Sequence, residues 1–245
     1  MEPEEYRKMD AEEDRMWWYL ATRGCMLRYL KKFLPDGTGP VLDGGCGTGG
    51  FLKLVGGAIP KADSIGIEMD SWATEMAMQK SGRPVVRGSV HQLPFRDRTL
   101  RAIVSTDVIY HKAVQEKEMI AESYRCLTKG GVLLVQAPAY TWMSSAHDAR
   151  VSGVRRYTRS EVEAILQEAG FSILLATYRN TFLFPLMVLQ RRLLKAKDGE
   201  SDVKPFPAFV EMAFRAIMSI EQVILGMGMT FPFGGSVVVV GMKNE

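Results

Sequence analysis

The sequence lacks the features of exported, metal-binding and membrane-spanning proteins. Its three cysteines form no C-x-x-C pair, which argues against a disulfide framework and a zinc site. No uncharged apolar run reaches the about 18 residues that cross a bilayer, and the N-terminus is acidic where a signal peptide would be basic and then apolar. A net charge of +3 is too small to indicate a nucleic-acid partner. We therefore expect a cytoplasmic globular protein with no metal and no nucleic acid.

The sequence does have an alternation of strand-like and helix-like segments between residues 40 and 179. This alternation predicts a doubly wound α/β fold, with a mostly parallel sheet and helices on both faces. One helix is expected over residues 114–131, where a glycine pair would end it. The expected regions are an N-terminal helical lid over 1–38, a core over 39–180, a helical insertion over 181–233 and a closing strand over 234–245.

The stretch PVLDGGCGTGG, residues 40–50, fits two cofactor motifs. With Gly50 as the third glycine it has the G-x-G-x-x-G spacing of a nicotinamide-dinucleotide site. With Gly49 as the third glycine, and Asp43 before the first, it has the D-x-G-x-G-x-G spacing of an S-adenosylmethionine (SAM) site. Glycines serve both cofactors, because they permit a tight turn and a close approach to the helix N-terminus. The loop alone therefore leaves both cofactors open.

Two acids near the loop help to separate these cofactors. Asp43 stands where a dinucleotide fold usually has an apolar residue, and an acid there suits the ammonium end of an amino-acid-like ligand better than a pyrophosphate. Glu68 ends the second strand in GIEMD, where it can accept hydrogen bonds from ribose hydroxyls of either cofactor. Asp43 therefore favours SAM, whereas Glu68 fits either cofactor.

Further segments in the same order strengthen this interpretation. They are GSVHQLPF, STDVIYH, YRCLTKGGVLLVQAP and EAGF. With them the chain resembles the class I SAM-dependent methyltransferases, in particular a bacterial and archaeal subgroup of type 11 and type 12 that includes ubiquinone-biosynthesis, sugar and lipid methyltransferases. The resemblance runs from about Trp17 to Gly241. It implies a Rossmann-like sheet of seven strands with the last strand antiparallel, SAM as cofactor, S-adenosylhomocysteine as product, and no metal.

The resemblance also implies a set of cofactor contacts. These residues are Gly45, Gly47, Gly49, Glu68, Met69, Ser89, Val90 and Thr106, and Asp43 and Arg23 are added to them for their charge and position. The glycine loop would cradle the methionine part, while Glu68 would hold the ribose and Met69 would pack on the adenine. Thr106 would lie beside the sulfonium, and Arg23 would reach the carboxylate from a lid helix. Ser89 stands where the family usually has aspartate, so its contact with the adenine would be weaker.

The acceptor side is less well specified by the sequence. A hydroxyl acceptor needs a base, and the catalytic candidates are His147, His111 and Tyr110. His147 comes first, with Asp148 to orient it. The candidates for contact with the acceptor are Trp18, Tyr140, Arg155 and Arg156. The arginines would bind a phosphate or carboxylate, although a salt bridge or plain packing is the alternative for each candidate.

The insertion contains two amphipathic stretches. In the second, apolar residues recur at helical spacing, namely Phe209, Met212, Ala216, Ile220, Val223, Ile224 and Met227. The first ends in a basic cluster of Arg191, Arg192, Lys195 and Lys197. Packing of the apolar stripe on the sheet is the favoured interpretation. The alternatives are peripheral contact of residues 182–228 with the inner membrane surface, a cover over the acceptor site, and a homodimer interface.

The sequence thus predicts transfer of a methyl group from SAM to a small-molecule or lipid-like acceptor, at oxygen rather than nitrogen. No Asn/Asp-Pro-Pro-aromatic segment follows the fourth strand, and Asp107 lacks the carboxylate partner of a magnesium-dependent catechol site. The alternatives are a membrane-surface lipid or glycan methyltransferase, and an N- or S-methyltransferase of a small metabolite. An NAD-dependent oxidoreductase and a non-catalytic SAM-binding protein are less favoured.

Overall fold

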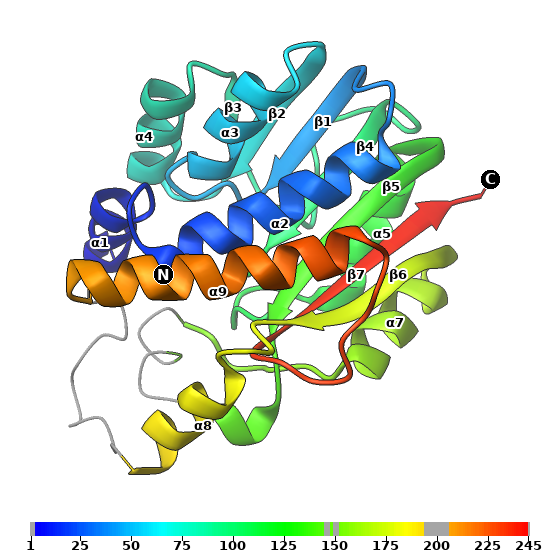
Figure 1. Cartoon of the computed structure of the whole chain (residues 1–245). Helices are drawn as coiled ribbons and strands as arrows, with labels where there is room; N and C mark the ends of the chain where they lie inside the picture. Colours follow the sequence, from blue (N-terminus) through cyan, green and yellow to red (C-terminus); the bar gives the residue numbers. More distant parts are fainter. Residues whose placement is uncertain (1–2, 145–147, 149–151, 194–205, 245) are drawn as a thin grey trace.

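The computed structural model describes residues 3–144, 148, 152–193 and 206–244 (Figure 1). Its centre is a seven-stranded sheet in the order β3-β2-β1-β4-β5-β7-β6. The strands are β1 (Gly39–Gly44), β2 (Ala62–Glu68), β3 (Val85–Arg87), β4 (Leu100–Thr106), β5 (Leu127–Pro138), β6 (Phe171–Arg179) and β7 (Ser236–Lys243). The helices are α1 (Pro3–Glu12), α2 (Trp17–Phe33), α3 (Gly50–Ala58), α4 (Ser71–Ser81), α5 (Glu116–Cys126), α7 (Arg159–Glu168), α8 (Phe184–Leu193) and α9 (Ala208–Gly226).

Strand directions follow the pattern that the sequence predicts. The strands β1 to β5 pair in parallel, whereas β7 runs antiparallel between β5 and β6. The strand order reverses between β1 and β4, and in doubly wound sheets ligands bind at the carboxyl ends of the strands beside such a reversal. The expected fold is confirmed. It predicts a ligand site at the carboxyl ends of β1 and β4.

Apolar residues cover both faces of the central strands. In β5, Leu133 and Val135 join a cluster with side chains from α5 and α7, while Val132 and Leu134 join a cluster with side chains from α2 and α3. Because successive residues of a strand point to opposite faces, a continuous apolar run is what a strand between two helical layers requires.

The helix expected over residues 114–131 is shorter than predicted. It ends at Cys126, and β5 begins at Leu127. The reason is pairing with β4: the Thr99 amide donates to the Cys126 carbonyl at 2.8 Å, and Leu127 pairs with Leu100 ahead of a bulge. The tertiary contact therefore ends the helix before its glycine pair.

The helices α2 and α9 lie side by side across one face of the sheet (Figure 1). The side chain of Gln222 donates to the Ala21 carbonyl at 3.1 Å. Glu211 is buried and accepts a hydrogen bond from the Trp17 amide at 2.7 Å, which satisfies an unpaired donor at the start of α2. Glu221 is also buried and accepts from the Asn180 amide at 2.6 Å.

The apolar stripe of α9 faces solvent, so the favoured prediction that it packs on the sheet is wrong. Five of its side chains are between 55% and 69% exposed, namely Phe209, Met212, Ile220, Val223 and Met227. The two buried glutamates point inward in their place, because each accepts backbone amides of a neighbouring segment. Within the described ranges, no helix is long and apolar enough to cross a membrane.

Candidate functional site

The glycine loop forms the turn from β1 to α3. Gly45, Gly47 and Gly49 all have positive φ, at 79°, 54° and 88°, a conformation that favours glycine. A Cβ at Gly49 would lie 2.7 Å from Cα of Ala77 in α4, whereas one at Gly47 would lie 2.6 Å from Cε of Met9 in α1. Gly49 therefore allows close packing of two helices, and the open side of Gly47 faces α1.

Glu68 lies directly beneath the loop, at the end of β2. It is buried, and its Oε2 accepts a hydrogen bond from the Gly47 amide at 3.0 Å. Its Oε1 accepts from the Met69 amide at 2.8 Å and from the Tyr6 hydroxyl at 3.0 Å. The acid predicted to hold a ribose is thus fixed in place, and it already binds a hydroxyl group, which comes from α1.

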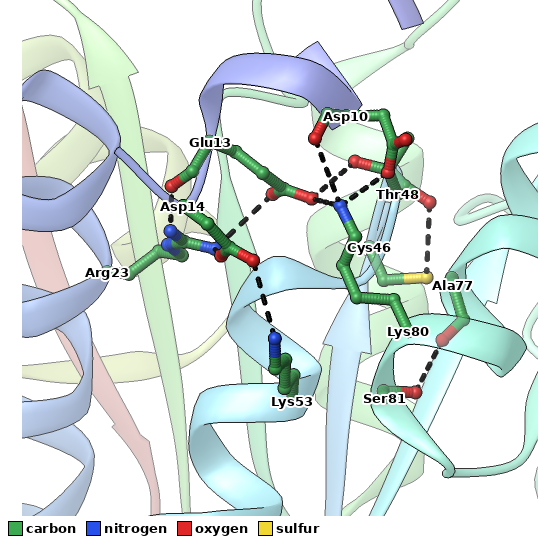
Figure 2. A network of polar contacts seen from close by, with 11 residues as sticks. Asp10, Glu13, Asp14, Arg23, Cys46, Thr48, Lys53, Ala77, Lys80 and Ser81 are labelled. Carbon is green, nitrogen blue, oxygen red and sulfur yellow. Dashed lines mark hydrogen bonds and ion pairs between the residues drawn. The ribbon is translucent and has the colours of Figure 1, made fainter. Parts of the chain in front are cut away.

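The carboxylate of Glu13, the residue after α1, lies at the amino end of α3 (Figure 2). Glu13 accepts a hydrogen bond from Thr48 Oγ1 at 2.7 Å and forms ion pairs with Lys80 and Arg23. Arg23 also donates to the Glu13 carbonyl and lies 3.1 Å from Asp14 Oδ1. The arginine predicted to bind the cofactor carboxylate therefore binds acids of the chain itself, at a helix end that favours anions.

Asp43 completes an acidic cluster with Glu13 and Glu68. It is buried at the end of β1, and among the described residues its Oδ2 has no hydrogen-bond partner. Burial raises the pKa of Asp43 to about 8, and repulsion from Glu13 and Glu68 adds to the rise. A cationic group beside these acids would relieve both effects. The ammonium and sulfonium of SAM carry that charge, so the residues present fit this cofactor.

The residues predicted to contact the adenine differ in burial and in hydrogen bonding. Met69 is exposed, and Val90 packs partly buried against the core. The Ser89 hydroxyl lies 3.0 Å from His91 Nδ1, so it is engaged locally. Thr106 ends β4, and among the described residues its buried hydroxyl has no partner. Their roles toward the cofactor stay predictions.

Asp107 is a functional candidate that sequence reasoning missed. It follows Thr106 with φ at 55°, in a region that non-glycine residues rarely occupy and that is enriched at active sites. Its Oδ2 accepts from Gln136 Nε2 at 2.9 Å, and Gln136 Oε1 accepts from Arg179 Nη1 at 2.8 Å. Burial raises the pKa of Asp107 to about 6, although Gln136 and Arg179 oppose the rise. The carboxylate is held rigidly at the strand reversal.

Arg179 is the largest fully buried side chain of the described structure and is only 1% exposed. Its Nη1 also donates to Thr22 Oγ1 at 2.6 Å. Its Nε and Nη2 have no partner in the part of the chain that the structure describes. An unpaired buried donor is costly.

Aromatic side chains gather on the other side of the edge. Tyr140, with φ at 58°, stacks between Trp142 at 5.6 Å and Tyr178 at 5.3 Å. The ring centroid of Phe184 lies 5.6 Å from that of Tyr140 and 5.9 Å from that of Phe233. We call these five residues the aromatic cluster. Only Tyr140 was predicted, because the others come from the 3-10 helix Thr141–Met143, β6, α8 and the segment before β7.

Two of the three predicted bases, Tyr110 and His111, lie among the described residues. His147 lies outside the described residues. The Tyr110 ring is buried, and its centroid lies 4.4 Å from that of His111. Burial, followed by the charge of Asp107, raises the pKa of Tyr110 well above its usual value, so its hydroxyl stays protonated near neutral pH and is not available as a base. His111 is partly exposed, and its amide donates to the Val108 carbonyl at 3.1 Å.

The predicted acceptor contacts are mostly engaged within the protein. Arg155 pairs with Glu116 at 2.5 Å. Arg156 donates two hydrogen bonds to Asp148, at 2.9 and 2.8 Å, so the acid expected to orient His147 binds this arginine. Trp18 packs partly buried beside α9 residues. Contacts within the protein therefore account for the positions of Arg155, Arg156 and Trp18. Their roles in binding an acceptor stay predictions. No cluster of metal-ligating side chains occurs among the residues described.

Comparison with known proteins shows the family. A methyltransferase domain family matches residues 16–176. A probable SAM-dependent methyltransferase of Mycolicibacterium smegmatis is 27% identical over 136 residues, which cover 54% of this chain and 52% of that protein. A probable tRNA methyltransferase 9B of Mus musculus is 31% identical over 112 residues, 45% of this chain and 23% of that protein. The chain therefore matches about half or less of the length of these relatives.

Solved structures share the fold. A methyltransferase of Haloferax volcanii, in complex with the activator Trm112, has a TM-score of 0.61 at 17% identity and covers 98% of both chains. The geranyl diphosphate C-methyltransferase of Streptomyces coelicolor, solved with geranyl diphosphate and S-adenosylhomocysteine, has a TM-score of 0.59 at 13% identity, with 88% of this chain and 78% of that one covered. The family match, the fold and the acidic cluster agree: this chain belongs to the class I SAM-dependent methyltransferases.

Proposed function

We propose that the protein transfers the methyl group of SAM to an oxygen of a small-molecule or lipid-like acceptor with a large apolar or aromatic part. The aromatic cluster carries this proposal, because it lies at the carboxyl edge of the sheet and Trp142 is 57% exposed. Stacked rings offer a planar or apolar group both area and a defined geometry. The neighbour solved with geranyl diphosphate gives a precedent for a lipid-like acceptor in this fold.

In this proposal the cofactor lies on the acidic side of the strand reversal, where it supplies an electrophilic methyl group. Glu68 accepts hydrogen bonds from the ribose hydroxyls of SAM. Asp43 faces the ammonium of its methionine part, and Arg23 binds the carboxylate of that part. The remaining contacts follow the family pattern, from Gly45, Gly47, Gly49, Met69, Ser89, Val90 and Thr106. Of the functions considered, an NAD-dependent oxidoreductase is not compatible with the family.

Residues 3–15, which we call the N-terminal segment, act as a lid in this proposal. Tyr6 presents a hydroxyl to Glu68, and Glu13 presents a carboxylate to Arg23. A ribose and an amino-acid carboxylate would present the same two groups. The lid must therefore release both contacts when the cofactor binds, and it competes with SAM until it does.

Asp107 serves as the base in the proposed reaction. A hydroxyl becomes a better nucleophile when its proton is removed as the new bond forms. Asp107 is partly exposed, it lies next to Thr106 at the strand reversal, and a pKa of about 6 leaves it ionised at neutral pH. Gln136 and Arg179 orient the carboxylate. His147 and His111 are the alternatives, and an amine or thiol acceptor would need less help from a base.

The experiment that tests this function is a methyl-transfer assay with labelled SAM and matched hydroxyl, amine and thiol acceptors, each with a short or a long apolar group. We expect the long hydroxyl acceptors to react fastest. Trp142→Ala should raise KM for these acceptors by about tenfold with little change in kcat, since a lost stacking contact weakens binding. Leu174→Ala, at an exposed position of β6, is the control. Equal rates for short and long acceptors would contradict the proposal.

The cytoplasm remains the proposed location, and we propose no nucleic-acid acceptor. The mouse relative is named for tRNA, but the matched region is 23% of its length. A lipid or glycan acceptor at a membrane surface is the second candidate function, and the exposed apolar face of α9 favours it.

A further inference from the structure

The outer face of α9 has an unusual composition for a helix in contact with water. This helix runs for 19 residues, and its charged residues are Glu211, Arg215 and Glu221. Both glutamates are buried, so Arg215 is the one charged residue that α9 presents to solvent. The apolar stripe defined above lies on the same exposed side. Apolar residues normally face the core in such a helix, and large exposed apolar patches mark sites of interaction.

The neighbouring helix adds positive charge to this surface. The charged residues that α2 exposes are Arg28, Lys31 and Lys32, and all three are basic. Arg28 is next to the end of α9, because a Cβ at Gly226 would lie 2.9 Å from its Nη1. Together α2 and α9 therefore present an apolar stripe flanked by basic side chains, with no exposed acid on either helix. We call this surface the α2–α9 face.

A second copy of the chain is a poor match for the α2–α9 face. A 19-residue helix is about 28 Å long and about 10 Å wide, so α9 would bury about 300 Å² per copy, whereas a stable interface buries about 800 Å² per partner. Adding α2 would enlarge the contact, but it would bring basic side chains of both copies together. Neither helix has an exposed acid to pair with them, so an enlarged contact would be opposed by like charge.

We infer that the α2–α9 face binds the surface of a lipid bilayer that contains anionic headgroups. An apolar stripe can enter the boundary between headgroups and acyl chains while flanking basic residues pair with anionic lipids. The charge pattern of the face meets both requirements. This inference does not depend on the proposed acceptor, because binding to vesicles needs no methyl transfer.

Vesicle sedimentation of the full chain tests the inference. We expect the protein to sediment with vesicles of phosphatidylcholine and phosphatidylglycerol, to sediment less with phosphatidylcholine alone, and to be released by high salt. The double variant Ile220→Glu/Val223→Glu should lose most of this binding, by about tenfold or more, since both side chains leave the apolar stripe. Leu174→Glu introduces the same charge at an exposed residue of β6 and should sediment like the wild type.

Further variants and measurements separate the other outcomes. Lys31→Glu/Lys32→Glu should weaken binding to the anionic vesicles and leave the thermal unfolding temperature nearly unchanged. Light scattering after gel filtration reports the oligomeric state. A dimer that Ile220→Glu/Val223→Glu converts to a monomer, with no vesicle binding by the wild type, would overturn the inference and assign the face to a second copy. A wild-type monomer that stays in the supernatant with every vesicle would also overturn it.

Discussion

The two sides of the strand reversal are built in different ways. On the cofactor side, Asp43 and Glu68 end the adjacent strands β1 and β2, and the glycine loop lies between them in the chain. On the acceptor side, the aromatic cluster draws on residues from 140 to 233. The first side is acidic and suits a cation, whereas the second offers stacked rings. In the proposed function, one edge of the sheet thus separates a cofactor site built from strand ends from an acceptor site assembled from distant segments.

This difference has a consequence for specificity. The central proposed cofactor contacts, Asp43, the glycine loop and Glu68, lie where strands end and a helix begins, so the sheet fixes their positions. The aromatic cluster instead depends on loops and on the insertion between β6 and β7, which can vary while the sheet stays intact. Acceptor choice should therefore follow the cluster and the insertion, and cofactor choice should follow the strand ends.

The largest expected effect concerns Asp107. Asp107→Asn should lower kcat for hydroxyl acceptors by about 100- to 1,000-fold, because the base is lost, while the dissociation constant of SAM changes little. In the wild type, kcat should fall as the pH drops below about 6, since the pKa of Asp107 is raised to about 6 and the protonated acid accepts no proton. Stopped assays across pH with both proteins check this. An unchanged kcat in Asp107→Asn would show that Asp107 is not the base.

The next effect is a pH dependence of SAM binding. The pKa of Asp43 is raised to about 8, so the free protein carries this carboxyl in protonated form at lower pH. An ammonium beside Asp43 favours the ionised form, and binding then releases a proton. The dissociation constant should fall as the pH rises toward about 8, by at most about tenfold per pH unit, and level off above it. Calorimetry in buffers of different ionisation enthalpy measures the released proton.

Asp43→Asn is the control for this linkage. It removes the titrating group, so its SAM affinity should depend less on pH than that of the wild type. A pH profile identical in both proteins would mean that another group accounts for the dependence.

The smallest effect tests the lid. Glu13→Gln should tighten SAM binding by about threefold to tenfold. The ion pair between Glu13 and Arg23 competes with the cofactor carboxylate, and losing its charge weakens that competition by about 1 kcal/mol. Tyr6→Phe should act in the same direction by freeing Glu68. Glu4→Gln, on the exposed side of α1, serves as the matched control. Weaker binding in both Tyr6→Phe and Glu13→Gln would show that the N-terminal segment adds contacts to the cofactor and does not compete with it.

The sequence predicted the features that depend on neighbours in the chain. The alternation of strands and helices and the place of Glu68 at the end of a strand follow from local patterns, and the closing antiparallel strand follows from the resemblance to class I methyltransferases. The direction of the α9 stripe could not be predicted, because it depends on the amides of Trp17 and Asn180, which need buried acceptors. The period of the apolar residues was correct, but it does not say which face of the helix meets the sheet.

The contacts of the N-terminal segment were also outside the reach of sequence reasoning. Tyr6 and Glu13 stand in an acidic stretch that resembles a solvated helix, and only the fold brings them to Glu68 and Arg23. Asp107 had one usable signal, its place directly after Thr106 at the end of a strand. Its positive φ and its hydrogen bond to Gln136 appear only in three dimensions.

The central claim is that Glu68 and the glycine loop hold SAM at the strand reversal, and calorimetric titration tests it most directly. The wild type and Glu68→Ala would each be titrated with SAM, S-adenosylhomocysteine and NAD, with Glu75→Ala on the exposed side of α4 as the control. We predict micromolar binding of the first two ligands, a loss of about 100-fold in Glu68→Ala, wild-type affinity in Glu75→Ala and no binding of NAD. Wild-type affinity for SAM in a folded Glu68→Ala, or preference for NAD, would contradict the account.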